Sequence, residues 1–125
     1  MSETRLDPRL PDPELLLPLP AVTFHILMAL AGGDLHGYAI IQDVATRTGN
    51  RLRLGAGTLY RSLERMLAQG LIVETGDRPA AELDDERRRY YRITPYGEAV
   101  ARAEASWLTD LVRLARASGF ARGRA

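Results

Sequence analysis

The sequence of this 125-residue chain predicts a mainly α-helical fold with one small β-hairpin, of the α+β class. Residues 54–72 carry apolar side chains at helical spacing and include a glycine where a helix would end. Two strand-like segments follow at 71–75 and 88–94, and a long apolar stripe then runs through 95–117. Short helices that lead into a hairpin and a last long helix indicate a winged helix-turn-helix with an added C-terminal dimerisation helix.

Composition excludes several functional classes. The chain has no cysteine, so it has no disulfide, thiolate metal site or cysteine nucleophile, and a reducing cytoplasm is the expected compartment. No apolar segment approaches the roughly 18 residues that span a bilayer, and the first seven residues lack the features of a signal peptide. We therefore expect a cytoplasmic protein with no membrane partner.

Residues 1–20 hold five of the seven prolines, which is unfavourable for a regular helix. We expect a proline-rich N-terminal arm that is extended and partly mobile. Its leucines at 15–17 could dock on the body of the protein or on a partner subunit. Contact of the arm with DNA is disfavoured, because its two arginines face four acidic residues.

Two short helices are predicted before residue 50. The densely apolar segment 21–31 ends at two glycines and reads as a buried first helix. A turn at 34–38 leads into a second helix at about 38–48, which is the pattern of a helix-turn-helix. The alternative is a three-helix bundle with solvated arginines. His25 is expected to pack in the first helix rather than bind zinc, since no cysteine or nearby histidine supports a metal site.

The third helix, at about 56–69, is predicted to present polar residues outward. Leu59, Leu63 and Met66 form its buried stripe. Between residues 37 and 66 the chain carries five arginines and two acidic residues, a local charge of +3. Arginines four residues apart with small hydroxyl residues between them suit phosphates and base edges in a major groove.

The hairpin completes the predicted winged helix at 21–94. The last helix, at 95–117, is the predicted dimerisation helix. The loop 76–87 contains an acidic cluster, which we interpret as a solvated wing tip rather than a metal site, and the arginines at 87–89 are placed near a phosphate backbone. Thr94 followed by proline is a strong helix start. Residues 118–125 are expected to be a flexible tail. The stripe that predicts pairing of two copies is Val100, Ala103, Trp107, Leu111 and Leu114.

Four segments in order resemble the PadR family of bacterial transcriptional regulators. They are 35–40 in the second helix, 57–63 in the third, 69–72 at its end, and 88–97 from the wing into the last helix, and together they span about residues 21–117. The single C-terminal helix is similar to the compact subgroup of the family. One departure is Gly55, where relatives often have a hydroxyl or acidic cap, and it puts a phosphate contact by that cap in doubt.

The resemblance implies a homodimer whose third helices read the major groove of an inverted-repeat operator. Members are usually repressors and are often released by a small aromatic or apolar compound. Trp107 on the apolar stripe is expected to belong to the dimer core, and contact with a planar aromatic effector is the alternative role for its ring. Two-fold pairing predicts half-sites about 34 Å apart or a multiple of it. The residues expected to contact DNA are Tyr38, Arg53, Thr58, Tyr60, Arg61, Ser62, Arg65, Arg88 and Arg89.

Two other functional classes, a protein-binding winged helix and an enzyme, fit the sequence less well than a DNA-binding regulator. A winged helix that binds protein instead of DNA would use the same dimer and leave the arginine face unoccupied by nucleic acid. An enzyme is disfavoured, because the chain has two histidines, no phosphate-binding glycine loop and no convergent catalytic set. We expect no cofactor and no bound metal.

Overall fold

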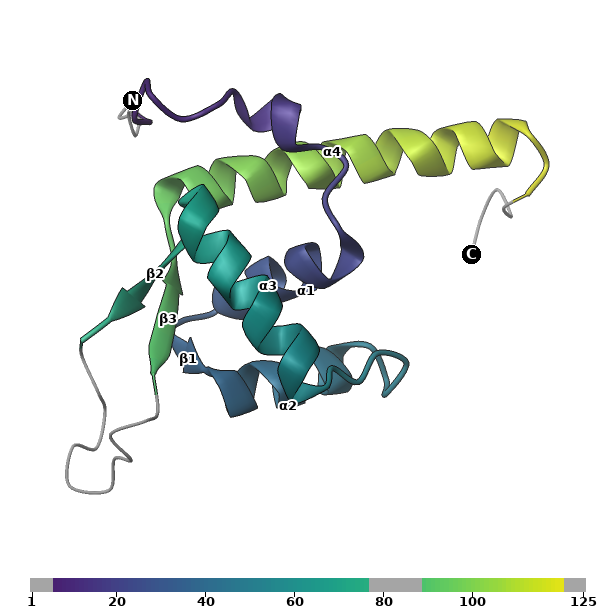
Figure 1. Ribbon diagram of the computed structural model, residues 1–125. Coiled ribbons are helices and arrows are strands. Elements are labelled where there is room, and N and C mark those ends of the chain that lie inside the picture. Colours follow the sequence, from purple (N-terminus) through teal and green to yellow (C-terminus); the bar gives the residue numbers. More distant parts are fainter. Residues whose placement is uncertain (1–5, 77–88, 121–125) are drawn as a thin grey trace.

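The computed structural model describes residues 6–76 and 89–120, and it confirms the predicted fold class. Helices α1, α2 and α3 and a small sheet form a body, along one side of which α4 extends (Figure 1). The elements in chain order are η1 (Pro13–Leu16), α1 (Ala21–Leu30), β1 (Leu35–His36), α2 (Gly37–Arg47), α3 (Ala56–Gln69), β2 (Ile72–Thr75), β3 (Tyr90–Ile93) and α4 (Pro95–Ala117).

The ends of α3 and α4 follow from local sequence signals. Gly70 ends α3 with a φ of 80°, in the left-handed region that glycine adopts without strain. At the start of α4, the side chain of Thr94 accepts a hydrogen bond from the backbone N–H of Gly97 at 2.9 Å, and Pro95 occupies the first turn. Gly55 precedes α3 without any side-chain cap, as the sequence predicted.

The sheet has the strand order β1-β3-β2 and is antiparallel throughout. The hairpin pairs Ile72 with Ile93 and Thr75 with Tyr90. The prediction that residues 34–38 form only a turn is wrong, because β1 pairs there with β3. A two-residue strand is too short to show alternation in the sequence, and its partner lies more than fifty residues away. The expected wing tip lies outside the described residues.

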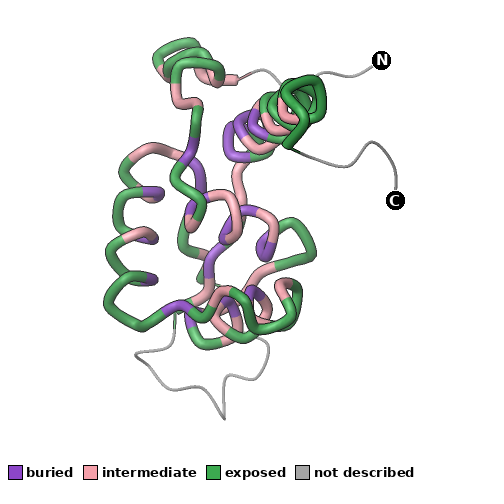
Figure 2. The backbone as a smooth tube through the Cα atoms, turned by 90° about the vertical axis from the view of Figure 1, so that its right-hand side faces the viewer, coloured by how far each residue is buried: buried purple, intermediate pink, exposed green. Residues whose placement is uncertain are grey.

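The core lies where α1 meets the other helices and the sheet. Helix α1 contacts α2, α3, α4 and β3, and α2 also packs against α3. Figure 2 shows the buried positions on the inner sides of the helices and the exposed positions on their outer sides. The largest fully buried side chains are Ile26, Leu27, Leu30, Ile40, Val44, Leu59, Leu63, Met66, Leu71, Ile72 and Val100.

The N-terminal arm packs on the body instead of extending from it. Its short helix η1 lies against α4, and Leu16 and Leu17 contact the hydrophobic core while Leu15 is exposed. Leu19 is itself part of the core. Docking on the body was one of the two sites considered for the leucines at 15–17, and it is confirmed for Leu16 and Leu17. Apart from η1, residues 6–20 form no regular helix, as the prolines predicted.

Helix α4 is buried in its first part and exposed in its second. Gly97 lies so close to the carbonyl oxygen of Leu71 that a Cβ atom would collide with it. Val100 is completely buried within its own subunit, so its predicted place in a dimer surface is wrong. Val100 belongs to the hydrophobic core because the first turns of α4 pack on the body. Beyond Glu104 most positions of α4 are exposed (Figure 2).

Candidate nucleic-acid interface

Helix α3 presents a polar face to solvent. Thr58, Arg61 and Arg65 are exposed, and Ser62 is half-buried beside them. Arg61 and Arg65 are four residues apart and therefore lie on one stripe of the helix. A guanidinium nitrogen of Arg61 lies 3.3 Å from the position that a Cβ on Gly57 would take, so this side chain extends back over the first turn.

This face carries uncompensated positive charge. Arg47 is the arginine of α2, and its Nε atom pairs with a carboxylate oxygen of Asp43 at 2.6 Å. No ion pair or side-chain hydrogen bond within residues 6–76 and 89–120 occupies the guanidinium groups of the other four arginines near α3. Glu64 is the exposed acidic residue of α3 itself. The unpaired arginines are Arg51, Arg53, Arg61 and Arg65.

Two exposed tyrosines lie at the junction of α2 and α3. The hydroxyl end of the Tyr60 ring is packed so closely on Gly37 that any side chain there would displace it. Tyr38 follows Gly37 in the first turn of α2 and is also exposed. The start of α2 is held by His36, whose Nδ1 atom accepts the backbone N–H of Ala39 at 3.2 Å. Histidine is an uncommon helix cap, and no sequence pattern predicted that His36 would cap α2.

The hairpin contributes one described arginine of the predicted wing. Arg89 is exposed, and its guanidinium pairs with a carboxylate oxygen of Glu74 on the facing strand at 3.2 Å. Arg88 lies outside the described residues. Tyr91 packs into the core beneath the hairpin, and burial raises the pKa of its hydroxyl. Arg89 is therefore less available to an anion than the arginines near α3.

A second ion pair fixes the hairpin to the body. Arg92 on β3 contacts Asp34 with two parallel bonds, Nε to Oδ1 at 3.1 Å and Nη2 to Oδ2 at 2.8 Å. The guanidinium holds the pKa of the Asp34 carboxyl below its ordinary value of 3.8. The sequence analysis missed this pair, because the two residues are 58 positions apart.

The second half of α4 forms an apolar surface. Its large hydrophobic residues are between 38% and 62% exposed, and Ala103 and Leu108 are half-buried beside them. A helix of a monomer seldom leaves this many large apolar side chains in water. We call this set the α4 apolar face: Trp107, Leu111, Val112 and Leu114.

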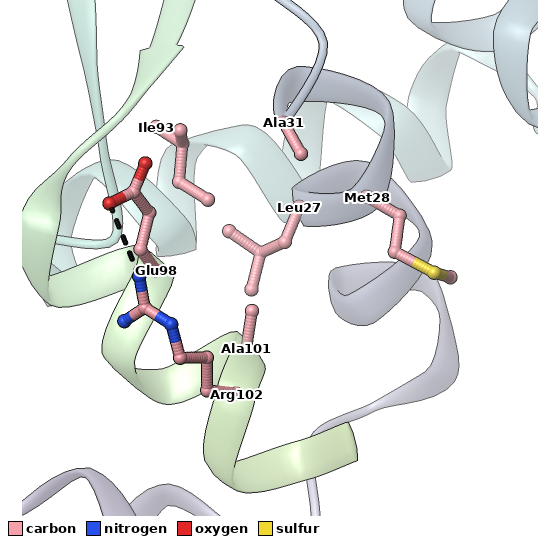
Figure 3. A pocket seen from close by; sticks show the side chains of 7 residues that line it. All are labelled: Leu27, Met28, Ala31, Ile93, Glu98, Ala101 and Arg102. Atoms are coloured by element: carbon pink, nitrogen blue, oxygen red, sulfur yellow. Dashed lines mark ion pairs between the residues drawn. The ribbon is translucent and has the colours of Figure 1, made fainter.

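Hollows border α4 at several points, and two of them concern the proposed effector. One of about 150 Å³ lies between Trp107 and the arm residues Glu14, Leu17 and Pro18. A larger one of about 260 Å³ lies between α1 and α4, with Leu27 and Ile93 among its apolar walls and the ion pair of Glu98 and Arg102 at one side (Figure 3). Both are below the roughly 300 Å³ at which ligand pockets usually begin, so each suits a ring or a side chain.

Within the described ranges, no group of three or more histidine, cysteine, aspartate or glutamate residues is arranged to hold a metal ion. His25 is half-buried in α1, as the packing interpretation predicted. The helices of the same ranges also include none that is long and apolar enough to cross a membrane.

Comparison with known families decides the classification. The model of the PadR-like family of transcriptional regulators matches residues 26–103, from α1 to the middle of α4. The chain belongs to this family. A curated relative, the transcriptional regulator Rv3488 of Mycobacterium tuberculosis, is 37% identical over 93 residues, which cover 74% of this chain and 80% of the relative. The resemblance seen in the sequence is thereby confirmed.

Solved structures share the fold. A transcriptional regulator from Clostridium thermocellum has a TM-score of 0.66 at 26% identity, with 76% of this chain and 86% of that chain covered. Bacillus subtilis PadR, solved in complex with operator DNA, has a TM-score of 0.56 at 22% identity, with 73% of this chain and 48% of that chain covered. At this identity the second likeness shows the fold alone.

Proposed function

We propose that this family member is a homodimeric, sequence-specific DNA-binding regulator of transcription, acting in the cytoplasm as a repressor. The observation that carries the proposal is the set of four unpaired arginines around the exposed face of α3. Guanidinium groups without an internal partner are free to pair with phosphates or with the edge of a guanine. Among the described residues of α2 and α3, Glu64 is the acidic side chain that has no ion pair and could reduce this positive charge.

The shape of α3 suits a major groove. Its 14 residues make a rod about 21 Å long, and the groove is about 12 Å wide, which admits one helix. Arg61 and Arg65, with Thr58 and Ser62, are assigned to base edges and nearby phosphates. Tyr38, Tyr60 and Arg53 are assigned to the phosphate backbone, and Arg88 and Arg89 to backbone contact by the wing.

The α4 apolar face supplies the proposed dimer contact. Pairing through Trp107, Leu111 and Leu114 would remove apolar area from water at about 25 cal/mol per Å². Ala103 remains in the proposed interface, and Val100 does not. Bacillus subtilis PadR bound to operator DNA supports DNA as the partner, and a structure of RosR shares the fold.

The test uses duplexes selected by the protein from a random pool. We expect an enriched inverted repeat, and affinity that falls with salt at a log-log slope of about 0.9 per phosphate neutralised. A mutated repeat should bind at least about a thousandfold more weakly. No enriched sequence and a flat salt response would favour the protein-binding alternative. A reporter gene behind the selected site distinguishes repression from activation.

The chain has a single tryptophan, which makes the effector proposal directly measurable. We propose that a small aromatic compound stacks on Trp107 and weakens operator binding. A small aromatic acid that neither absorbs nor emits in the tryptophan emission band, such as benzoate, should change the tryptophan emission and release the selected duplex at the same concentrations. Release without a change in emission would place the effector elsewhere, for example in the larger hollow between α1 and α4.

A further inference from the structure

The arm is tied to α4 at two points. The hydroxyl of Tyr96 donates a hydrogen bond to the carbonyl oxygen of Pro11 at 2.7 Å. The backbone N–H of Leu19 donates to Oε1 of Glu104 at 3.0 Å. Residues 11–19 therefore lie beside residues 96–104, and Figure 1 shows the arm following this part of α4 before it turns into α1.

The arm also touches the end of α3. A methyl carbon of Leu10 lies 3.5 Å from where a Cβ on Gly70 would be, at the residue that ends the helix. The arm thus contacts the helix proposed to read DNA and the helix proposed to pair the subunits. The family model begins at residue 26, so the arm lies outside the matched region.

Glu104 holds the arm with a buried carboxylate, which is not the arrangement that would stabilise the fold most. It is 3% exposed, and burying a carboxylate costs more free energy than one hydrogen bond from a backbone N–H returns. A leucine would fill the same space without that penalty. What the carboxylate adds is one fixed position for the arm on α4, because its oxygen accepts a bond from one N–H at one distance.

The two hydrogen bonds with the arm limit how far α4 can tilt about its N-terminal end. Thr94 and Gly97 fix the start of the helix to the end of α3, and Glu104 lies about 12 Å further along it. Leu111 lies about 22 Å from Tyr96 along the axis. A displacement of about 1 Å at Glu104 would therefore grow to about 2 Å at Leu111 in each subunit.

That displacement matters on DNA. One base pair moves a half-site by about 3.4 Å along the axis and turns it by about 35°. Two subunits that each shift by about 2 Å would change the distance between their α3 helices by about 4 Å, close to the rise of one base pair, and a firmly held α4 also resists the turn that accompanies it. A loosely held α4 would tolerate several spacings.

We propose that the arm, through Glu104 and Tyr96, sets the angle of α4 and thereby the spacing of the half-sites that the dimer accepts. Both are positioning residues that do not touch DNA. The proposal rests on the proposed function, because spacing has meaning only for a dimer that binds two half-sites.

The experiment uses the full chain and the selected inverted repeat. Affinities are measured for the repeat, for versions with the spacer one base pair longer or shorter, and for a duplex with one half-site. The wild type should prefer the selected spacing by at least about tenfold. Glu104→Leu should reduce that preference to about twofold or less, while its half-site affinity stays within about twofold of the wild type.

Two further variants separate positioning from folding. Glu104→Gln keeps an oxygen that accepts the Leu19 N–H, so it should retain the wild-type preference. Tyr96→Phe loses only the hydroxyl bond to Pro11 and should show an intermediate preference. Thermal unfolding of Glu104→Leu should change little, because the removal of a buried carboxylate offsets the loss of the acceptor for the Leu19 N–H.

Two results would overturn the proposal. In the first, Glu104→Leu keeps the full spacing preference; in the second, it loses half-site and full-site affinity by the same factor, as a folding defect would. Absence of any enriched repeat with the wild-type protein would instead overturn the proposed function, and this inference with it.

Discussion

The exposed face of α3 and the apolar face of α4 both lie open, but they differ in chemistry. The first carries Arg61 and Arg65 among small polar side chains, and the second carries large hydrophobic residues around Trp107. A guanidinium group is well solvated in water, so the α3 face is stable without a partner. Exposed apolar area raises the free energy of the free subunit. For the proposed dimer, we therefore expect that pairing through α4 does not depend on DNA.

Gly97→Ala should disrupt both faces together, because it acts where α4 joins the end of α3. The new Cβ would collide with the carbonyl oxygen of Leu71, and we expect a loss of about 3 kcal/mol in the free energy of unfolding, measured in urea. Gly57→Ala is the control. A Cβ there meets only a movable arginine end within 4 Å, and alanine should stabilise the helix by up to about 1 kcal/mol. Equal effects of the two substitutions would contradict the close approach at Gly97.

Leu111→Glu should abolish the α4 contact and leave the α3 face unchanged. Placing a carboxylate in an apolar interface should weaken the dimer by about 2 to 3 kcal/mol, which sedimentation equilibrium can measure. Thr109→Glu introduces the same charge on the opposite side of α4, where Thr109 is exposed, and should leave the dimer intact. A dimer that survives Leu111→Glu would show that the subunits pair through another surface.

Arg61→Ala should weaken DNA binding by the α3 face and leave the α4 contact unchanged. We expect operator affinity to fall by about 1 to 3 kcal/mol, with the dimer constant unchanged, in a fluorescence titration of the selected duplex. Arg113→Ala is the matched control, because Arg113 is also an exposed helical arginine but is paired with Asp110 at 2.8 Å. Unchanged affinity in the Arg61 variant would remove this residue from the interface.

The smallest effect is expected at Asp34, whose pair with Arg92 joins the hairpin to the body. The pKa of the Asp34 carboxyl is lowered in the folded state, so the pair stabilises the protein above the ordinary value of 3.8. This contribution is lost as the pH falls through the lower folded value. Because both side chains are partly exposed, we expect less than about 1 kcal/mol.

Asp34→Asn is the corresponding variant for unfolding at pH 7 and pH 3. It should be less stable than the wild type at pH 7, and the difference should narrow at pH 3. The α3 and α4 faces should be unaffected at neutral pH. A difference that does not change with pH would show that the carboxylate charge is not what stabilises the hairpin.

Local patterns predicted the parts of the fold that local physics determines. The spacing of Leu59, Leu63 and Met66 placed α3 with its arginines outward, and Gly70 and Thr94 marked the helix ends where the structure has them. Such signals need only the residues within a few turns. The contacts of the proposed site with DNA stay predictions.

Contacts between distant residues could not be predicted in the same way. The bond from Leu19 to Glu104 joins positions 85 apart, and a glutamate in a helix reads as a solvated residue. Val100 matched the stripe of the dimer surface by spacing alone, although it is buried in the core of its own subunit. Periodicity shows which side of a helix is apolar, but it does not show which neighbour covers that side.

The bond between Leu19 and Glu104 also affects how a shortened protein would behave. A recombinant version starting at residue 21, the first residue of α1, would lose the Leu19 N–H that donates to this carboxylate and the leucines of the arm that pack against the core. We expect it to express poorly or to aggregate, because the Glu104 carboxylate and the apolar side chains beneath the arm would be exposed to water. For crystallisation or screening, the safer boundary lies upstream of Leu6.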